Sequence, residues 1–342
     1  MINNYQEKQF DLITFGEILG RISVKKGHIL RDGEEVVLNF AGAESTVASL
    51  VATFGQRVSI LTKVPYSSAG VAIQNMLMSN GVNVNYVIDD LSPTARAGIY
   101  YSTPGGYPRK PKVEYDRCNS SFANMTIDEL PKGIFSSTKM FHTSGISLGI
   151  QPELTKELLQ RFKREGTIIS FDVNYRANIW PDESKLAEAL LEIIPYVDIF
   201  FCSKETFEKT FQMTGDLKKN QKDFALKHDI RIVVSTIRTI KTAALHDFDS
   251  ILYDLENDIH FQGKPYKNIH VCDRIGSGDA YVAGFLYYLM MFEDCDLALK
   301  FANAVSADAN TIYGDCNPPS FEHISKIIKD HESSEKGSEM SR

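Results

Sequence analysis

One stretch of the chain combines residue types that suit the transfer of a negatively charged group. Residues 272–280 read Cys-Asp-Arg-Ile-Gly-Ser-Gly-Asp-Ala, and a helical run follows to Met291. Glycines without a Cβ atom let the backbone approach a ligand, and the N–H groups at the start of a helix attract an anion. A carboxylate beside such an anion hole could take a proton from an attacking hydroxyl, as phosphoryl transfer requires. The predicted catalytic residues are Gly276, Ser277 and Gly278 in the anion hole and Asp279 as the base.

The same motif also has a plainer interpretation. Gly-x-Gly-Asp can be an ordinary turn followed by an acidic residue in the first turn of a helix, and short glycine motifs often match by chance. The chain has no Gly-x-x-x-x-Gly-Lys-Ser/Thr loop, so phosphates could be held only by this late motif. The first strand ends in residues 15–20, Phe-Gly-Glu-Ile-Leu-Gly, which lack the Gly-x-Gly-x-x-Gly spacing of dinucleotide-binding oxidoreductases.

The segments around the motif predict an α/β fold with a mostly parallel central sheet and helices on both faces. After about residue 126, strand-like and helix-like segments alternate, and further strands are expected at 243–246 and 250–254. Ligands bind such sheets at the carboxyl ends of the strands. Asp172 and Asp279 both follow strand-like segments directly, so both are expected at that edge.

Two segments outside this alternation predict a small β-sheet lid. Residues 20–40 and 97–122 alternate apolar and polar residues around turns rich in glycine and proline. A sheet this small cannot bury both of its faces, so we expect it to cover a ligand cleft and to pair with a second lid in a homodimer. One domain is expected over residues 11–329, and the Ser-, Glu- and Lys-rich tail 331–342 is expected to be disordered.

The composition argues against several kinds of partner. The 342 residues carry a net charge of −7, which disfavours a nucleic-acid or anionic-membrane binder. No segment approaches the apolar length needed to cross a bilayer. The five cysteines include no Cys-x-x-Cys pair, and residues 1–10 lack the apolar core of a secretory signal, so a cytoplasmic protein with free thiols is expected.

Taken together, these features resemble the ribokinase-like (PfkB-type) carbohydrate kinases over roughly residues 11–329. The resemblance rests on an early Gly-Ala-Glu at 42–44, the hairpin lid and the late Gly-x-Gly-Asp-Ala. Within that family, Phe-Asp-Val-Asn-Tyr-Arg-Ala-Asn-Ile-Trp at 171–180 and Asp-Arg-Ile-Gly-Ser-Gly-Asp-Ala at 273–280 resemble the 2-keto-3-deoxygluconate kinases. The resemblance implies ATP-dependent phosphorylation of a primary hydroxyl of a sugar acid, with Mg²⁺ bridging the phosphates.

The resemblance also implies a substrate site. Its residues are Gly42, Tyr100, Tyr115, Arg117, Ile146 and Arg176. A planar guanidinium can hold the carboxylate of a sugar acid with two hydrogen bonds, so Arg117 and Arg176 are the candidates for that contact. The alternative for each arginine is an ordinary salt bridge, and without the resemblance Tyr100 and Tyr115 would be assigned to the aromatic residues that strands favour.

The nucleotide side departs from the common family pattern. Residues 234–238, Val-Ser-Thr-Ile-Arg, stand where many relatives have a glycine-containing loop, so hydroxyls and an arginine are expected to contact the phosphates there. The resemblance places residues 203–205 near the phosphates and metal, although Glu205 could equally be a plain charge at a helix start. The predicted nucleotide-binding residues are Ser203, Glu205, Ser235, Thr236, Arg238 and Asn303, the last beside the adenine.

Two other functions stay open. A neutral-sugar kinase of the same family, such as a fructokinase or ribokinase, would need no arginine for a carboxylate. A non-catalytic sugar or nucleotide sensor would need no general base, so the intact Gly-x-Gly-Asp argues against it.

Overall fold

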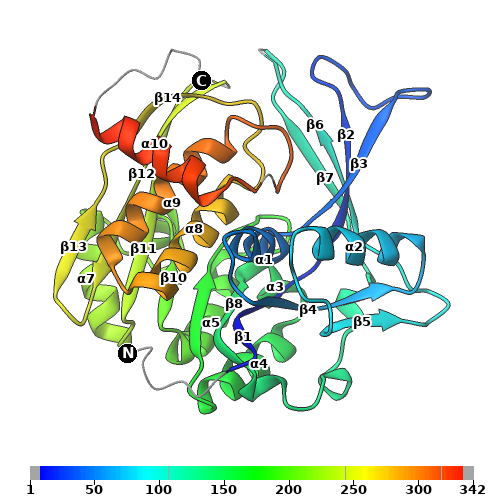
Figure 1. The fold of residues 1–342 in the computed structure, drawn as a ribbon, viewed down its shortest axis with the longest axis horizontal. Coiled ribbons are helices and arrows are strands. Elements are labelled where there is room, and N and C mark those ends of the chain that lie inside the picture. The colour runs from blue at the N-terminus through cyan, green and yellow to red at the C-terminus, as the bar shows by residue number, and fades with distance from the viewer. Residues whose placement is uncertain (1–7, 107, 243, 317, 334–342) are drawn as a thin grey trace.

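One large sheet forms the centre of the computed structural model, which describes residues 8–106, 108–242, 244–316 and 318–333 (Figure 1). Its strands are β1 (Phe10–Phe15), β4 (Val58–Pro65), β5 (Val87–Asp90), β8 (Thr138–Ser144), β9 (Ile168–Asp172), β10 (Ile199–Phe201), β11 (Ile232–Thr242), β12 (Leu245–Asp254), β13 (Ile259–Gln262) and β14 (Tyr266–His270). They lie in the order β13-β12-β11-β10-β9-β8-β1-β4-β5, with β14 paired to β12. All pairs from β11 to β5 are parallel, and only the edge beyond β11 is antiparallel. The predicted α/β fold is confirmed.

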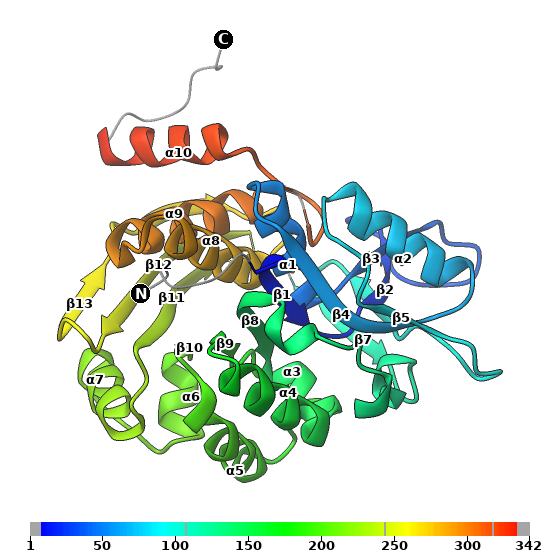
Figure 2. The same ribbon diagram turned by 60° about the horizontal axis from the view of Figure 1, so that its bottom comes forward.

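Helices cover both faces of this sheet (Figure 2). They are α1 (Ala43–Thr53), α2 (Ser68–Ser79), α3 (Gly145–Ile150), α4 (Pro152–Arg164), α5 (Glu183–Ile193), α6 (Lys204–Lys209), α7 (Leu217–His228), α8 (Ser277–Phe292), α9 (Cys295–Ala309) and α10 (Phe321–Ser333). Short 3-10 turns occur at Phe122–Asn124, Ile127–Glu129, Ile134–Ser136 and Ile194–Tyr196. Helices α1, α2, α8, α9 and α10 lie on one face and α3 to α7 on the other (Figure 2). In the described part of the chain, no helix is both long and apolar enough to cross a bilayer.

Two hydrophobic layers follow from the geometry of the parallel strands. In β10, Ile199 and Phe201 pack into the layer under α1, α8 and α9, whereas Phe200 between them packs into the layer under α4, α5 and α7. Consecutive side chains of a strand point to opposite faces, so a strand covered on both sides has to be apolar throughout. The short, continuous apolar runs in the sequence are therefore the central strands of the sheet.

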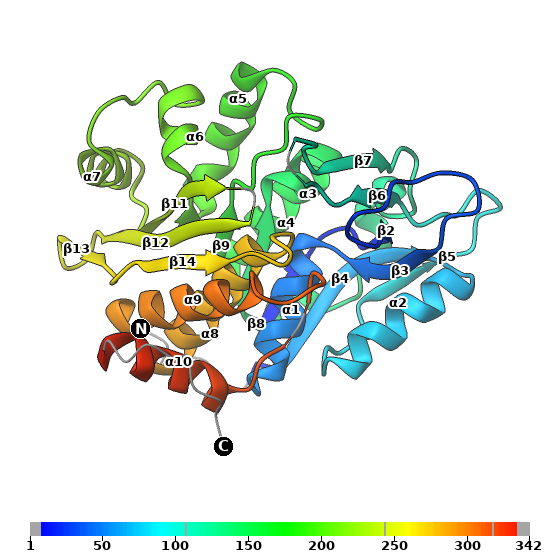
Figure 3. The ribbon, with the colours of Figure 1, turned by 90° about the horizontal axis from the view of Figure 1, so that it is seen from above.

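The lid is a separate sheet of four strands (Figures 1 and 3). It consists of β3 (Val36–Ala41), β2 (Leu19–Val24), β6 (Ile99–Thr103) and β7 (Lys112–Asp116), in that order. Strands β2 and β6 pair in parallel, and the outer pairs are antiparallel. It lies at the opposite end of the molecule from β13 (Figure 3). The small sheet predicted from the segments 20–40 and 97–122 is thus present, with β2 beginning at Leu19 and β3 ending at Ala41.

Two local expectations differ from the structure. Strand β12 runs unbroken where two shorter strands were expected, because its polar middle stays paired with the long strand β11. Residues 331–333, placed in a disordered tail, form the last turn of α10, and residues 334–342 lie outside the described residues. Helix α10 packs Ile324, Ile327 and Ile328 against the rest of the core, which is the spacing of one helical face.

Candidate active site

A glycine loop between β14 and α8 begins the site. Gly276 is the N-cap residue of α8 and adopts a left-handed conformation with a φ of 83°. A Cβ atom there would lie 2.4 Å from the carbonyl oxygen of Asp315, so both the backbone angle and the close neighbour require glycine. The Ser277 hydroxyl donates to the carbonyl oxygen of Arg274 at 2.9 Å, and the Ser277 carbonyl accepts from Ser306 at 2.9 Å. The loop is held from both sides at the start of a long helix, where backbone N–H groups favour an anion.

Asp279 follows in the first turn of α8 and lies among other carboxyl groups. Burial raises the pKa of Asp279 to about 7, nearby Arg176 lowers it, and Asp172 raises it further. Burial also raises the pKa of Asp172, at the end of β9, to about 6. The side-chain amide of Asn174 donates to Asp279 Oδ1 at 3.3 Å. Asp279 is thus a carboxyl group that ionises near neutral pH, as a general base should.

Arg176 has a guanidinium group that is largely uncommitted. It lies in the loop after β9, is half-buried and donates from Nη1 to the backbone carbonyl of Tyr175 at 3.0 Å. Among the described residues no carboxylate lies within ion-pair distance of it, although its charge acts on both Asp172 and Asp279. A guanidinium group in this position can accept an anionic ligand without first breaking a salt bridge.

Arg117, the other predicted carboxylate-binding arginine, is already paired. Its Nε and Nη2 atoms donate to Glu17 Oε2 at 2.9 and 2.5 Å. Its guanidinium carbon also lies 5.5 Å from the centre of the Tyr115 ring. The structure therefore distinguishes two arginines that the sequence presented as equivalent. A role for Arg117 in holding substrate stays a prediction, and it would require Glu17 to share or release the guanidinium.

The two lid tyrosines lie opposite each other on neighbouring strands. Tyr100 of β6 is in register with Tyr115 of β7, and their ring centres are 5.7 Å apart. Tyr100 is buried and its hydroxyl donates to Asp315 Oδ2 at 2.6 Å, whereas Tyr115 is 38% exposed. The lid thus contacts the loop beside Gly276 through Tyr100, and Tyr115 stays partly exposed.

Another part of the site is formed by the starts of α1, which follows lid strand β3 directly, and of α3. A Cβ atom at Gly42, the N-cap residue of α1, would lie 2.1 Å from the carbonyl oxygen of Glu17, so the close approach of two backbones requires glycine there. Next to it, the buried Glu44 accepts hydrogen bonds at 2.6 Å from Ser144 and 2.7 Å from Ser147, and burial raises its pKa. Ile146 of α3 is half-buried. These contacts place Gly42 and Ile146 beside a buried polar cluster, and their predicted contact with substrate stays a prediction.

The first four predicted nucleotide-binding residues differ in whether their side chains are already hydrogen-bonded within the protein. Ser203 is the N-cap residue of α6, and its hydroxyl accepts from the Thr206 N–H at 3.1 Å, whereas Glu205 is exposed. Ser235 is 1% exposed and donates to the carbonyl oxygen of Cys202 at 2.6 Å. Its hydroxyl thus joins β11 to the end of β10, while the neighbouring Thr236 is half-buried. Glu205 and Thr236 are the positions here whose side chains are free of such structural hydrogen bonds in the described residues.

Arginines from three parts of the chain come together on the nucleotide side. Arg238 of β11 has its pKa lowered by burial and then by the charges of Arg274 and Arg176, while Glu205 acts in the opposite direction. Burial, Arg238 and Arg274 also lower the pKa of His246, which is 4% exposed. Its Nε2 atom has no hydrogen-bond partner in the described part of the protein. This concentration of positive charge in an acidic protein suits a polyanion such as a nucleotide phosphate chain.

Asn303 of α9 presents a buried donor without a partner. Its Oδ1 accepts from the Ser250 hydroxyl at 2.8 Å, but its Nδ2 has no hydrogen-bond partner among the residues described. A Cβ atom at Gly263 would lie only 2.6 Å from that Nδ2 atom. A buried amide left unpaired costs stability, so a ligand acceptor such as a ring nitrogen of adenine would satisfy it.

Five residues of the site escaped prediction from the sequence: Arg21, Asn174, Asp273, Arg274 and Asp315. Asn174 and Arg274 lie inside the two stretches that carry the resemblance, so their polar side chains were an available signal. Arg21 alternates with apolar residues in a lid strand, and Asp315 follows a glycine in a loop beyond α9. Nothing in the local sequence of these two marks them as neighbours of the anion hole.

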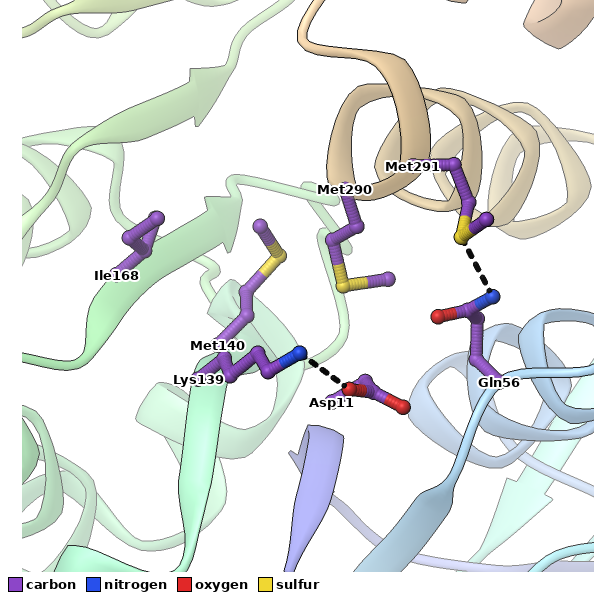
Figure 4. Close-up of a pocket in the computed structure, with 7 residues that line it drawn as sticks. All are labelled: Asp11, Gln56, Lys139, Met140, Ile168, Met290 and Met291. Atoms are coloured by element: carbon purple, nitrogen blue, oxygen red, sulfur yellow. Dashed lines mark hydrogen bonds and ion pairs between the residues drawn. The ribbon is translucent and has the colours of Figure 1, made fainter. Parts of the chain in front are cut away.

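A small pocket at the other end of α8 is not part of this site (Figure 4). It is lined by Asp11, Gln56, Lys139, Met140, Ile168, Met290 and Met291. The two charged residues that line it pair with each other, because Lys139 Nζ lies 2.9 Å from Asp11 Oδ1. Met290 is about 16 Å from Asp279 along the helix, at 1.5 Å per residue. The chemistry of the chain therefore gathers at the carboxyl ends of the strands and leaves this pocket apart.

The sequence matches a known protein family over the central sheet, the lid and the helices up to α9. Residues 9–320 match the family described as pfkB family carbohydrate kinase. The chain is 30% identical over 322 residues to a 2-dehydro-3-deoxygalactonokinase of Haloferax volcanii, covering 93% of this chain and 96% of the relative. It is 29% identical over 231 residues to a 2-dehydro-3-deoxygluconokinase of Bacillus subtilis, covering 64% of this chain and 70% of that relative. Each of these relatives is named for a kinase of a 2-dehydro-3-deoxy sugar acid.

A solved structure shows the same arrangement in space. The crystal structure of a 2-dehydro-3-deoxygluconokinase from Thermotoga maritima superimposes with a TM-score of 0.88 at 26% identity. The superposition covers 95% of this chain and 100% of the other. Lid, central sheet and glycine loop therefore fall within one shared architecture.

Proposed function

The chain belongs to the pfkB family of carbohydrate kinases, and we propose that it transfers the γ-phosphoryl group of ATP to a primary hydroxyl of a 2-keto-3-deoxy sugar acid. The observation that carries the substrate class is Arg176, a half-buried arginine beside Asp279 whose only protein partner described is a backbone carbonyl. A neutral sugar offers nothing for this charge to bind, whereas a sugar acid offers a carboxylate. The names of the relatives from Haloferax volcanii and Bacillus subtilis support the same class.

The proposed chemistry assigns one task to each side of the site. The sugar hydroxyl loses its proton to Asp279 as its oxygen forms a bond to the γ-phosphorus, and the bond from that phosphorus to the bridging oxygen of ADP breaks. N–H groups of residues 276–278 stabilise the charge that builds up on the transferred group. Glu205, an exposed carboxylate whose charge acts on Arg238, would contribute to holding Mg²⁺, which would supply further neutralisation of the phosphates.

The nucleotide is proposed to lie between β11 and α9. Arg238 and Arg274 would hold its phosphates, since their charges already act on each other at short range. The unpaired Asn303 amide would donate to the adenine. Thr236 supplies a hydroxyl on the same strand as Arg238, whereas the Ser235 hydroxyl is used within the protein.

Replacing Arg176 by alanine tests the substrate class. Loss of a charged, bidentate contact is worth about 2–3 kcal/mol, so kcat/KM for a sugar acid should fall by roughly 10²-fold. Because Arg176 also lowers the pKa of Asp279, both sugars are compared at a pH well above that pKa, where the same enzyme should lose less than about threefold on any neutral sugar that the wild type phosphorylates. A coupled assay on a panel of paired acid and neutral sugars with ATP measures both values.

Two further variants sharpen this result. Arg176→Lys keeps the charge but not the planar pair of donors, and it should recover only part of the loss. Arg161→Ala removes an exposed arginine of α4 that pairs with Glu157, and its kinetics should match the wild type. Equal losses on acid and neutral sugars in Arg176→Ala would exclude the carboxylate contact and favour a neutral-sugar kinase.

The exposed lid favours a homodimer. Val36, Val37 and Leu38 of β3 are 46, 49 and 56% exposed, an unusual run of apolar residues for one surface strand. We expect light scattering at micromolar concentration to give twice the chain mass of 38.4 kDa. Leu38→Glu should convert the dimer to a monomer, because a buried charge at an apolar interface is costly.

A matched substitution on another surface controls for the added charge. Leu226 of α7 is 58% exposed, and Leu226→Glu should leave the mass unchanged. A wild-type monomer, or a dimer that survives Leu38→Glu, would contradict pairing through the lids. A cytoplasmic location stays a prediction from the sequence.

A further inference from the structure

Arg21 of the lid strand β2 reaches across to the main domain. Its side chain is 8% exposed, and Nη2 lies 2.6 Å from Asp273 Oδ2 while Nη1 pairs with Asp315 Oδ1. Its Nε donates to Ser23 at 2.8 Å, which fixes the orientation of the guanidinium within the strand. All three nitrogen atoms of one buried arginine are therefore used, two of them on carboxylates outside the lid.

Both carboxylates belong to the loops that shape the anion hole. Asp273 uses its other oxygen, Oδ1, to accept from the N–H of Ile275 at 3.1 Å, directly before Gly276. The carbonyl oxygen of Asp315 faces Gly276 at a distance that leaves no space for a Cβ atom. Arg21 thus binds the loop before Gly276 through Asp273, which also caps the turn at Ile275. It binds the second loop through Asp315, whose backbone carbonyl lies against Gly276.

The neighbouring lid strand makes the same connection. Tyr100 of β6 is in register with Arg21, and its hydroxyl donates to Asp315 Oδ2 at 2.6 Å. The two oxygens of Asp315 are therefore both held by lid residues. Arg21 also affects the charge near Asp279. Asp315 raises the pKa of Asp279, and Arg21 forms an ion pair with Asp315.

We propose that Arg21 is a positioning residue for phosphoryl transfer, which holds the anion hole in its working shape when the lid is seated on the main domain. It makes the geometry of residues 273–278 depend on the lid that covers the sugar. A lid that lifts would withdraw the guanidinium from Asp273 and Asp315 and loosen both loops around Gly276. Because the loops around Gly276 would be loose whenever the lid is open, transfer of the phosphoryl group to water in the absence of sugar would be suppressed. The proposal rests on the kinase function proposed above but not on the identity of the sugar.

Arg21→Ala should act mainly on turnover. Misplacing a catalytic group by about 1 Å can cost roughly 10²-fold, so kcat should fall by that order while KM for the sugar changes less than about threefold. The rise of kcat/KM with pH should move to higher pH, because the charge of Asp315, which raises the pKa of Asp279, would lose Arg21 as its counter-ion. Guanidinium ion at millimolar concentration should restore part of kcat by entering the vacated space, whereas the same concentration of sodium chloride should not.

Arg31→Ala is the matched control, because Arg31 is also a lid arginine but is 68% exposed and pairs only with Glu34 in the described residues. It should keep wild-type turnover and pH dependence. Hydrogen–deuterium exchange gives a readout that needs no substrate: amides of residues 273–279 should exchange faster in Arg21→Ala than in the wild type, and those in Arg31→Ala should not.

A double-mutant cycle covers the case in which Arg21→Ala fails to fold. Arg21→Met and Asp273→Asn keep side-chain volume, and their effects on kcat should be strongly non-additive because each breaks the same contact. Additive losses, an unchanged pH profile, or no rescue by guanidinium would show that Arg21 serves only the stability of the lid. All assays use whichever sugar the wild type phosphorylates best, so a wrong sugar class and a wrong role for Arg21 give different results.

Discussion

Replacing Asp279 by asparagine is expected to lower kcat by about 10³-fold, within the range that general-base catalysis contributes. The amide keeps the size of the carboxyl group and can still accept from Asn174, but it cannot take a proton from the sugar hydroxyl. Binding of the nucleotide and the sugar should therefore survive, as measured by calorimetry. Turnover that persists in Asp279→Asn would contradict the mechanism, whereas a wild-type protein that binds both ligands without turnover would agree with a sensor, whose ligand site needs no base.

The pH profile tests the same residue without a mutation. Burial raises the pKa of Asp279 to about 7, so kcat/KM should fall about tenfold per pH unit below that value and level off above it. A carboxyl group with its ordinary pKa of 3.8 would give a flat profile over this range. The position of the bend therefore reports whether the carboxyl group is as buried as the structure shows.

The raised pKa of Asp279 also lowers the stability of the folded protein at high pH. The folded protein holds the Asp279 proton up to about pH 7, whereas the unfolded chain releases it near 3.8, so stability falls as the pH rises between these values. Above pH 7 the penalty is on the order of a few kcal/mol. Asp279→Asn lacks it and should melt at a higher temperature than the wild type at pH 8 while losing activity. A lower melting temperature at pH 8 would contradict the buried state of the carboxyl group.

Asp172 provides the matched control for Asp279. It is a half-buried carboxyl group at the same edge of the sheet, and its Oδ1 accepts from the Asn174 N–H at 3.0 Å. Asparagine in its place keeps that acceptor, so Asp172→Asn should lose less than about tenfold in kcat, which is the effect of a changed local charge. Similar losses in both variants would mean that the proton acceptor has not been assigned correctly.

Gly278→Ala should separate stability from activity in the anion hole. A Cβ atom at Gly278 meets nothing within 4 Å, and the residue lies in the first turn of α8 with no left-handed backbone angle. The fold should therefore accept alanine and gain up to about 1 kcal/mol from its higher helix propensity. The added methyl group would occupy space that the transferred phosphoryl group needs, so kcat should fall by roughly 10²-fold.

Gly276→Ala is the informative comparison, because it should fail for a different reason. The left-handed conformation costs alanine about 1–2 kcal/mol, and the clash with the Asp315 carbonyl adds to this. Melting temperature and kcat should both fall in Gly276→Ala, whereas only kcat should fall in Gly278→Ala. An active Gly278→Ala enzyme would show that the phosphates are held elsewhere.

The fold and the position of the glycine loop at the start of α8 could be predicted because local chemistry determines them. A strand covered by helices on both faces must be apolar at every position, so β10 and residues 232–234 of β11 appear as short apolar runs in the sequence. Gly276 and Asp279 are three residues apart, and a turn followed by a helix brings them together whatever the rest of the chain does. The lid segments were visible for a similar reason, since half-exposed strands alternate in polarity. Helix α10 was missed although its apolar spacing is helical, because the tail beyond it dominated the composition there.

The side-chain contacts of the site could not be predicted, because they join residues that are far apart in the sequence. Arg117 and Glu17 are 100 residues apart, Asn174 and Asp279 are 105 apart, and Arg21 and Asp315 are 294 apart. No local pattern records such pairs, because they arise only when loops at the edge of the sheet and the lid meet. The pKa of Asp279 depends in the same way on burial by neighbours from several elements.

By itself, the sequence determined the sheet, the lid segments and a glycine loop that places a carboxyl group at the start of a helix. Only the tertiary structure decided which arginine keeps its guanidinium available for a ligand, that burial raises the pKa of Asp279, and that Arg21 of the lid pairs with Asp273 and Asp315 beside the glycine loop. The physical reason is the range of each effect. Periodicity and turn chemistry act within a few residues, whereas burial and ion pairing act between whatever side chains the fold brings into contact.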